Sequence, residues 1–405
     1  MQDFDTPDDY FAWYDANGFS RIINVNGTMT SLGGSITRGT VRRATVDVMG
    51  RFVKMNELQT KASRVIAQLT GAQSGCITAS ASAGISLAVA GAITGMNPVA
   101  AENLPRAVGS RSDVVVQLGH LCNYGAPLAT AIELTGARVV AAGQSTLCTD
   151  YQFDATLTEN TAAAVYVVSH HVVAYGQIPF ARFARIAHAK GVPVIVDAAS
   201  EYDLTRFIAE GADIAIYSGH KFLGGPTSGI IAGNTDLVRA AYLQNVGIGR
   251  GMKVGKESIA GVIAAMEAWM QRDHDGIRAE EDAALTLWQG AVEGLPGIAA
   301  LKIDDPTGNP LQRLQIIVDP TRAGASAATF ARALGQEDPA IIVRNHEVEL
   351  GYFQLDPCNL TPGQAPLVAD TLSRVLAQGS SLTANEDDFA SARNGGTDAY
   401  MNWKG

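Results

Sequence analysis

The sequence has few cysteines, few charged residues and no apolar run long enough to cross a membrane. Its four cysteines are widely spaced, with no CxxC pair and no metal-ligand spacing, so no metal site is predicted and a reduced, cytoplasmic protein is expected. The longest apolar stretch, residues 81–93, is too short to span a bilayer. The acidic N-terminus lacks the pattern of a signal peptide. A membrane partner is therefore not expected.

Clustered positive charge is also missing. Lys and Arg total 30 against 40 Asp and Glu, which gives a formal net charge of -10. Binding to nucleic acid depends on basic side chains that neutralise phosphates, so a nucleic-acid partner is disfavoured. By contrast, 47% of the 405 residues are hydrophobic, enough for a large core in one large domain with a smaller one attached, or in two or three units.

Short apolar strands alternate with amphipathic helices through most of the chain. Strands are expected at residues 113–117, 162–168, 192–197, 213–217 and 228–232. Helices are expected at residues 56–69, 180–190, 202–210 and 256–272. Continuous β-branched runs separated by helices indicate an α/β protein whose mainly parallel sheet is covered on both faces.

The pattern changes toward both ends of the chain, which suggests four regions. We expect an irregular arm over 1–50, a large domain over 51–255, a linking helix with a small α+β domain over 256–378, and a polar tail over 379–405. The tail is expected to be disordered or to lie on a partner subunit.

Polar side chains follow two of the expected strands at the point where each strand ends. Asp197 ends VIVD, whereas Ser218, His220 and Lys221 follow DIAIY. The carboxyl ends of parallel strands line one crevice, so these groups are expected to converge. A lysine amine that forms a Schiff base, with a carboxylate to pair with a pyridine nitrogen, is what pyridoxal 5'-phosphate (PLP) requires. Ser218 is placed to reach the cofactor phosphate.

A phosphate also needs a cradle, and residues 81–84 offer one at the start of an apolar helix. Backbone N–H groups around Ser82, Ala83 and Gly84 would meet a dianion at the positive helix end, without bulky side chains in the way. Small residues are also common where a helix packs closely on a sheet. The prediction of a phosphate site at residues 81–84 depends mainly on its occurrence together with Asp197 and Lys221.

These motifs resemble fold-type-I PLP enzymes, and more narrowly the group containing bacterial selenocysteine synthase and D-glucosaminate-6-phosphate ammonia-lyase. The resemblance spans about residues 20–375. Its markers are INVNGT (23–28), TSLGGS (30–35), GHLCNYGA (119–126), SGHKFLGGP (218–226) and GIGRGMKVGKE (247–257). It implies an aspartate-aminotransferase-like large domain with a mainly parallel seven-stranded sheet. Because the motifs begin near Arg21, no preceding tRNA-binding domain is expected, and transfer of selenium to tRNA is disfavoured.

The resemblance also implies roles for single residues. His120 would stack on or flank the PLP ring, with help from Asn123 or Tyr124. Ser169 and His171 would approach the cofactor. The resemblance further suggests phosphate contacts, in part from a neighbouring subunit, by Arg250, Lys253 and Lys256. Arg344, in IIVRN (341–345), would hold a substrate carboxylate.

Ordinary structural roles compete with several of these assignments. Asp197 has the alternative role of a helix cap, and His220 of a packed histidine. Arg344 is equally explained by a salt bridge, and Arg250 by a solvated charge. Cys358 is interpreted as an inert thiol.

By the same resemblance, the expected reaction is α,β-elimination of a hydroxylated amino acid to a 2-oxo acid and ammonia. An aminotransferase or a racemase on the same scaffold is the alternative, since all three reactions begin by removing the Cα proton. A non-catalytic PLP-binding protein is a third interpretation, which Asp197 and Lys221 argue against. The partners expected are a small amino-acid substrate and further copies of the chain, in a homodimer or higher homo-oligomer.

Overall fold

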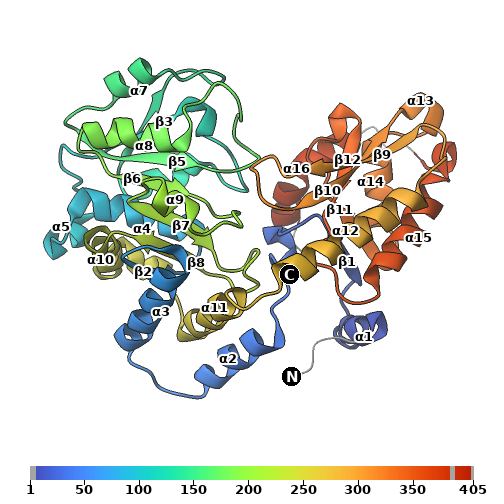
Figure 1. Cartoon of the computed structure of the whole chain (residues 1–405), viewed down its shortest axis with the longest axis horizontal. Coiled ribbons are helices and arrows are strands. Elements are labelled where there is room, and N and C mark those ends of the chain that lie inside the picture. The colour runs from blue at the N-terminus through green and yellow to red at the C-terminus, as the bar shows by residue number, and fades with distance from the viewer. Residues whose placement is uncertain (1–5, 384–387, 403–405) are drawn as a thin grey trace. The chain divides into compact units, whose positions relative to one another are not determined.

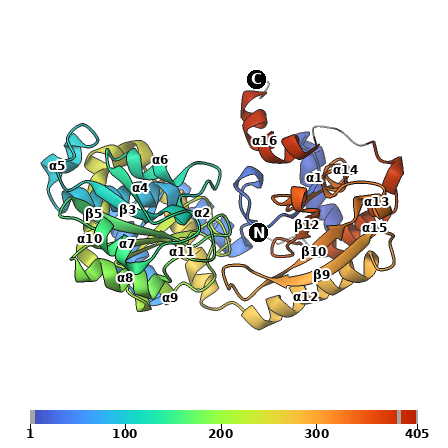
Figure 2. The ribbon, with the colours of Figure 1, turned by 90° about the horizontal axis from the view of Figure 1, so that it is seen from above.

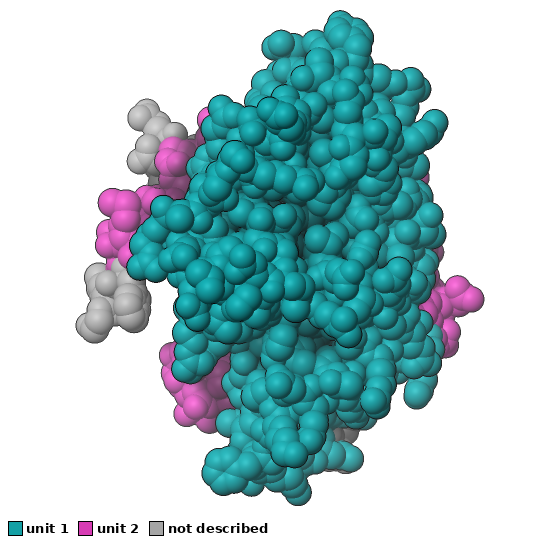
Figure 3. All heavy atoms as spheres, turned by 90° about the vertical axis from the view of Figure 1, so that its left-hand side faces the viewer, with its two compact units in different colours: residues 1, 37–272 teal, residues 2–36, 273–405 magenta. Residues whose placement is uncertain are grey.

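The computed structural model describes residues 6–383 and 388–402, and its contacts divide the chain into two compact units. Unit 1 spans Thr37–Arg272. Unit 2 combines the residues up to Ile36 with those from Asp273 onward. Figure 3 colours the two units separately. The domain limits expected at residues 50, 255 and 378 remain predictions, although the helix expected to link the domains lies within unit 1.

A seven-stranded sheet forms the centre of unit 1 (Figure 1). Its strands, in spatial order, are β2 (Ser74–Thr78), β8 (Gly229–Gly233), β7 (Ile214–Ser218), β6 (Val194–Asp197), β5 (Thr161–Val167), β3 (Asp113–Gln117) and β4 (Arg138–Ala142). Five neighbouring strands, from β7 to β4, run parallel, whereas β8 is antiparallel to both of its neighbours. The predicted fold class, with its mainly parallel seven-stranded sheet, is confirmed.

Helices cover both faces of this sheet, as the hydrophobic strands require. The helices of unit 1 are α2 (Gly39–Met49), α3 (Met55–Thr70), α4 (Ala81–Thr94), α5 (Pro98–Asn103), α6 (Leu128–Glu133), α7 (Asp150–Thr156), α8 (Phe180–Ala189), α9 (Arg206–Ala209), α10 (Thr235–Leu243) and α11 (Lys256–Trp269). Alternate strand residues point to opposite faces, so one hydrophobic core lies under α3, α7, α8 and α11 and another under α4, α6 and α10. Figure 2 shows α4 and α8 on opposite sides of the strands.

Unit 2 is an α+β structure with a core of its own. An antiparallel sheet contains β12 (Tyr352–Leu355), β10 (Gln312–Val318) and β9 (Ile298–Asp304), and a parallel pair joins β1 (Ile22–Val25) to β11 (Ala340–Val343). The helices are α1 (Pro7–Asn17), α12 (His274–Ala291), α13 (Pro320–Ala323), α14 (Ala327–Gly335), α15 (Gln364–Leu376) and α16 (Asp388–Met401). Among the described residues, no helix combines the length and hydrophobicity needed to cross a membrane.

Three local expectations were wrong. The N-terminal arm is not irregular, because it contains α1, β1 and α2. The disorder expected for the tail is wrong for its described part, which includes α16, whose buried Asp388 accepts a hydrogen bond from Arg332 at 2.6 Å. The alternative, that the tail lies on a partner subunit, stays a prediction. The helix expected over 202–210 is only α9, because the Asp203 carboxylate accepts the N–H groups of residues 205 and 206 and delays the helix start. Residues 1–5, 384–387 and 403–405 of the expected arm and tail lie outside the described residues.

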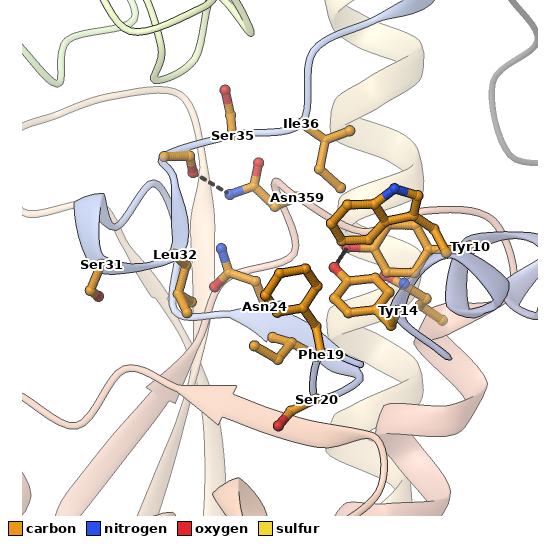
Figure 4. Close-up of a pocket in the computed structure, with 14 residues that line it drawn as sticks. Tyr10, Tyr14, Phe19, Ser20, Asn24, Ser31, Leu32, Ser35, Ile36 and Asn359 are labelled. Atoms are coloured by element: carbon orange, nitrogen blue, oxygen red, sulfur yellow. Dashed lines mark hydrogen bonds between the residues drawn. The ribbon is translucent and has the colours of Figure 1, made fainter. Parts of the chain in front are cut away.

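Unit 2 also contains a cavity of about 520 Å³ beside α1 (Figure 4). The ring of Trp13 stacks on that of Phe19, and the hydroxyl groups of Tyr10 and Tyr14 lie 2.8 Å apart. No charged side chain is among the residues that line it. None of the predicted site residues lines this cavity.

Candidate active site

Lys221 lies in a tight turn directly after β7. The turn is closed by backbone hydrogen bonds from Gly224 to Lys221 (2.9 Å) and from Gly225 to Gly219 (2.8 Å). A Cβ atom on Gly219 would lie 2.2 Å from the Ser228 hydroxyl oxygen, so only glycine fits where the turn begins. The sequence therefore folds here into a compact loop that fixes the backbone of Lys221.

Asp197 is the last residue of β6 and is 5% exposed. Its strand lies beside β7 with Asp197 opposite Ile216, and its Oδ1 accepts the N–H of Ala199 at 3.1 Å. The parallel register brings the ends of both strands to one edge of the sheet, where Asp197 and Lys221 influence each other's charge. The predicted convergence of these two groups is thus present in the structure.

The pKa shifts of Asp197 and Lys221 indicate that a cation bound beside Asp197 would be stabilised. Burial raises the pKa of the Asp197 carboxyl, and the nearby Lys221 only partly opposes this rise. Burial likewise lowers the pKa of the Lys221 amine, whereas the charges of Asp197 and Glu201 raise it. A protonated pyridine nitrogen beside Asp197 would stabilise its carboxylate, and a lysine amine with a lowered pKa is a better nucleophile. The residues present therefore fit PLP.

Two further predicted groups flank the lysine. The Ser218 hydroxyl lies 3.0 Å from Nδ1 of His220. Burial, and then the positive charge of Lys221, lower the pKa of His220. His220 is therefore neutral, and positive charge in the site comes from Lys221 or from a bound cation.

Helix α4 begins in the loop after β2, with Ser80 as its N-cap. The Ser80 hydroxyl accepts the N–H of Ala83 at 3.0 Å. A Cβ on Gly84 would approach Ile216 of β7 to 3.1 Å, so small residues let the helix start close against the sheet. The positive helix end, with Ser82 in its first turn, is a suitable place for a phosphate dianion.

His120 ends the short 3-10 helix η2 (Leu118–His120) and is 2% exposed. Its Nδ1 accepts the N–H of Val167 at 3.2 Å, and its ring meets Tyr166 edge-on at 4.5 Å. Burial lowers the pKa of His120 from 6.5 to about 4. The imidazole is therefore neutral and held at the carboxyl end of β5, next to β6.

The loop after His120 also approaches the acid. Burial and then the charge of Asp197 raise the pKa values of Cys122, to about 11, and of Tyr124. Both groups stay protonated at neutral pH. Ser82, at the start of α4, lies near Tyr124, whose buried hydroxyl forms no hydrogen bond within the described residues.

Three predicted residues of unit 1, Ser169, His171 and Arg250, are less enclosed. The Ser169 hydroxyl, after β5, accepts the N–H of the exposed His171 at 3.2 Å. Arg250 is exposed in the 3-10 helix η4 (Ile248–Met252). Lys256, in contrast, uses its amine to bond the carbonyl oxygens of Met49 and Arg51. Its predicted phosphate contact is therefore less favoured than those of Arg250 and Lys253.

Arg344 belongs to unit 2 and is 5% exposed. Burial and the neighbouring Arg313 lower its pKa, and Arg313 itself is paired with Asp305 (2.7 Å) and Asp356 (3.1 Å). Among the described residues, none forms a hydrogen bond or ion pair with the Arg344 guanidinium. A buried cation of this kind is a good receptor for a carboxylate. The predicted alternative, an ordinary salt bridge, finds no partner in the described structure.

Sequence reasoning missed two residues beside the lysine. Ser200 accepts a hydrogen bond from the Lys221 amine, and the buried Glu201 acts on the charge of that amine. Both follow β6 directly, in the sequence DAASE (197–201). The rule that placed Asp197 at the carboxyl edge applies equally to the residues just after it, so position was an available signal.

Comparison with known proteins places this arrangement in a family. The model of the L-seryl-tRNA selenium transferase family (SelA) matches residues 22–289. The chain belongs to this family. Within it, the chain is 36% identical to D-glucosaminate-6-phosphate ammonia lyase of Salmonella typhimurium, over 89% of this chain and 97% of that protein. It is also 36% identical to 5'-C-glycyluridine monooxygenase-decarboxylase of a Streptomyces species, over 92% and 94% of the two chains.

Two solved structures support the family and the fold, respectively. A structure of D-glucosaminate-6-phosphate ammonia-lyase matches with a TM-score of 0.82 and 35% identity, over 91% of this chain and 99% of that one. Aspartate aminotransferase from Thermus thermophilus matches with a TM-score of 0.53 and 12% identity, over 90% and 94% of the two chains, which shows the shared fold alone. The predicted family and the aspartate-aminotransferase-like fold are confirmed.

Proposed function

We propose that this protein is a PLP-dependent lyase that converts a hydroxylated amino acid to a 2-oxo acid and ammonia by α,β-elimination. The observation that carries the proposal is the pair formed by the buried Asp197 and the partly buried Lys221 at neighbouring strand ends. The ammonia-lyase relative, which is similar over almost its whole length, supports the choice of reaction.

The residues divide the work of holding the cofactor. Asp197 would pair with the pyridine nitrogen, Lys221 with the aldehyde carbon, and the first turn of α4 with the phosphate, assisted by Ser218. His120 would flank the ring. When bound, PLP supplies an electron sink for the pair left on Cα after proton removal.

The chain's own groups then move the protons. Lys221, when its amine is free, would take the Cα proton, because its lowered pKa increases the uncharged fraction of the amine. Its ammonium form can return that proton to the departing β-hydroxyl, which leaves as water. The released enamine takes up water to give a 2-oxo acid and ammonia. Asp197 stays ionised opposite the ring nitrogen throughout.

The substrate is expected to carry a carboxylate, and Arg344 is the candidate to bind it because its guanidinium is buried and lacks a described partner. Ser169 and His171 are further candidates for contacts with the cofactor or the substrate. We expect the reaction to take place in the cytoplasm.

The Streptomyces relative favours a second candidate, an oxygen-dependent decarboxylation, because its identity to this chain is also 36%. The two reactions leave different products. Elimination releases ammonia and a 2-oxo acid without consuming oxygen, whereas a monooxygenase-decarboxylase consumes oxygen and releases carbon dioxide.

A screen of D- and L-amino acids with a β-hydroxyl, with and without a terminal phosphate, tests the proposal. Ammonia, 2-oxo acid, oxygen and carbon dioxide are measured together, with Lys221→Ala as the inactive control. Equal yields of ammonia and 2-oxo acid under anaerobic conditions are expected. Transfer of the amino group to a second oxo acid would indicate an aminotransferase, and inversion at Cα without ammonia a racemase.

We also propose that the chain forms an oligomer in which the exposed Arg250 binds the PLP phosphate of a neighbouring subunit. We expect a homodimer or higher homo-oligomer in solution, and about tenfold weaker PLP retention in Arg250→Ala, from the loss of one charge-assisted hydrogen bond. Equilibrium dialysis with PLP and size-exclusion chromatography measure the two effects. Unchanged PLP affinity in an intact oligomer would remove Arg250 from the site.

A further inference from the structure

The hydroxyl of Ser200 is bonded to the amine of Lys221, and the fold holds it there. After β6 the chain makes a tight turn, in which Ala199 donates to the Asp197 side chain (3.1 Å) and the Glu201 N–H to the Ala198 carbonyl (3.1 Å). The Ser218 N–H donates to the Ala199 carbonyl at 3.3 Å. These bonds join the residue before Ser200 to the strand that leads to Lys221. The backbone therefore holds the Ser200 hydroxyl next to the Lys221 amine.

Two ionisable groups act on the charge of Lys221, which itself acts on a third. Asp197 and Glu201 raise its pKa, and the positive charge of Lys221 lowers that of His220. In the proposed function Asp197 is committed to the ring nitrogen, so it is not the hydrogen-bond partner of the free amine. Glu201 is a charge in the surroundings of the amine, whereas Ser200 is the group in direct contact with it.

We propose that Ser200 is a positioning residue, which holds the amine of Lys221 at the reaction centre while that amine is free of the cofactor. The inference rests on the proposed function. A hydroxyl suits the task because it accepts an N–H from the ammonium form and donates to the lone pair of the neutral form. The amine then keeps one location before and after it takes the Cα proton, which is the requirement for returning that proton to the same substrate.

The first test uses the full-length chain freed of PLP, so it does not depend on the reaction. Lys221 is labelled with limiting acetic anhydride over a range of pH, and its acetylation is quantified by mass spectrometry. Ser200→Ala removes a hydrogen bond from both forms of the amine, and the bond to the charged form is the stronger one, so the midpoint of the labelling curve is expected to fall by about one pH unit. Ser200→Thr keeps the hydroxyl and is expected to restore the wild-type midpoint.

A purely structural role predicts a different result. Loss of activity in Ser200→Ala with an unchanged labelling midpoint would overturn the proposal, as would the same midpoint shift in the alanine and threonine variants. If Ser200→Ala melts well below the wild type, Ser200→Cys replaces it. Its thiol is a weaker acceptor of similar size, and a smaller shift in the same direction is expected.

The second test uses the PLP-loaded enzyme. Ser200→Ala is expected to lower kcat about 10- to 100-fold with KM changed less than threefold, because the amine acts after the substrate has bound. If Ser200→Thr lowered kcat as much as Ser200→Ala does, with KM at the wild-type value, the proposal would be contradicted. Failure of the lyase assignment would instead appear as no ammonia from the wild type, while the labelling experiment would still report on Ser200.

Discussion

Replacing Asp197 by Asn tests the electrostatic role of this residue with little change in shape. The amide has nearly the volume of the carboxylate, and its oxygen can still accept the N–H of Ala199. Only the charge is lost. Because Asp197 is 5% exposed, solvent does little to screen that charge from a cation beside it.

The size of the effect follows from what one buried charge partner does to a pKa. An opposite charge in contact shifts a pKa by about 1–3 units, which corresponds to about 1.4–4 kcal/mol. If the ring nitrogen loses this stabilisation, its protonated form becomes rarer and kcat is expected to fall about 10- to 1,000-fold. The sign for Lys221 is also fixed, since removing the Asp197 charge lowers the pKa of its amine further.

The assay is ammonia release at saturating PLP, with cofactor content measured by absorbance and folding by thermal melting. Asp203→Asn is a matched control, because Asp203 is an acid of the same loop region whose carboxylate accepts the N–H groups of Thr205 and Arg206. It is expected to keep kcat within about threefold of the wild type. If Asp197→Asn retained PLP and its kcat stayed within twofold of the wild type, Asp197 would not be the partner of the ring nitrogen.

Two further changes test the packing around the site. Gly219→Ala would place a Cβ atom 2.2 Å from the Ser228 hydroxyl oxygen, so we expect a loss of about 1–3 kcal/mol in the free energy of unfolding. Denaturant titration measures this loss, and Gly50→Ala, where nothing lies within 4 Å, is the control. His120 has a folded-state pKa of about 4 against 6.5 unfolded, so the unfolded chain binds the extra proton first and stability falls as pH drops through this window, by about 3 kcal/mol. His120→Asn is expected to remove this acid sensitivity in unfolding curves at pH 4 and 7, and an unchanged pH dependence would refute the assignment.

The centre of the fold could be predicted because its signals are local. The hydrophobic runs of β3, β5, β6 and β7 mark strands within one or two residues of their observed limits. The position of Asp197 and Lys221 followed from the rule for parallel strand ends. Neither inference needed any knowledge of distant contacts.

The parts that were missed depend on contacts between distant segments or on overlooked caps. Strand β1 pairs with β11, more than 300 residues later, and nothing in its four residues reveals that partner. Helix α16 is tied to the fold by Asp388 and Arg332. Helix α1, however, has a Thr6 cap followed by Pro7 and a C-terminal Gly18, which are local signals that could have identified it.

The side-chain roles in the site were harder to predict than its location. Ser200 and Glu201 look like loop residues until the turn after β6 places them beside Lys221. His120 was expected at the ring, and the structure adds that its Nδ1 is already bonded to Val167. Hydrogen-bond partners of this kind depend on strand register, which the sequence does not display.

Chemical trapping of the cofactor tests the central claim most directly. Purified protein is incubated with PLP, reduced with borohydride and digested, and mass spectrometry then locates the pyridoxyl group. We predict a single major adduct on the peptide containing Lys221, and none in Lys221→Ala. An adduct mainly on another lysine, or no adduct in folded protein, would contradict the assignment of Lys221 as the cofactor lysine.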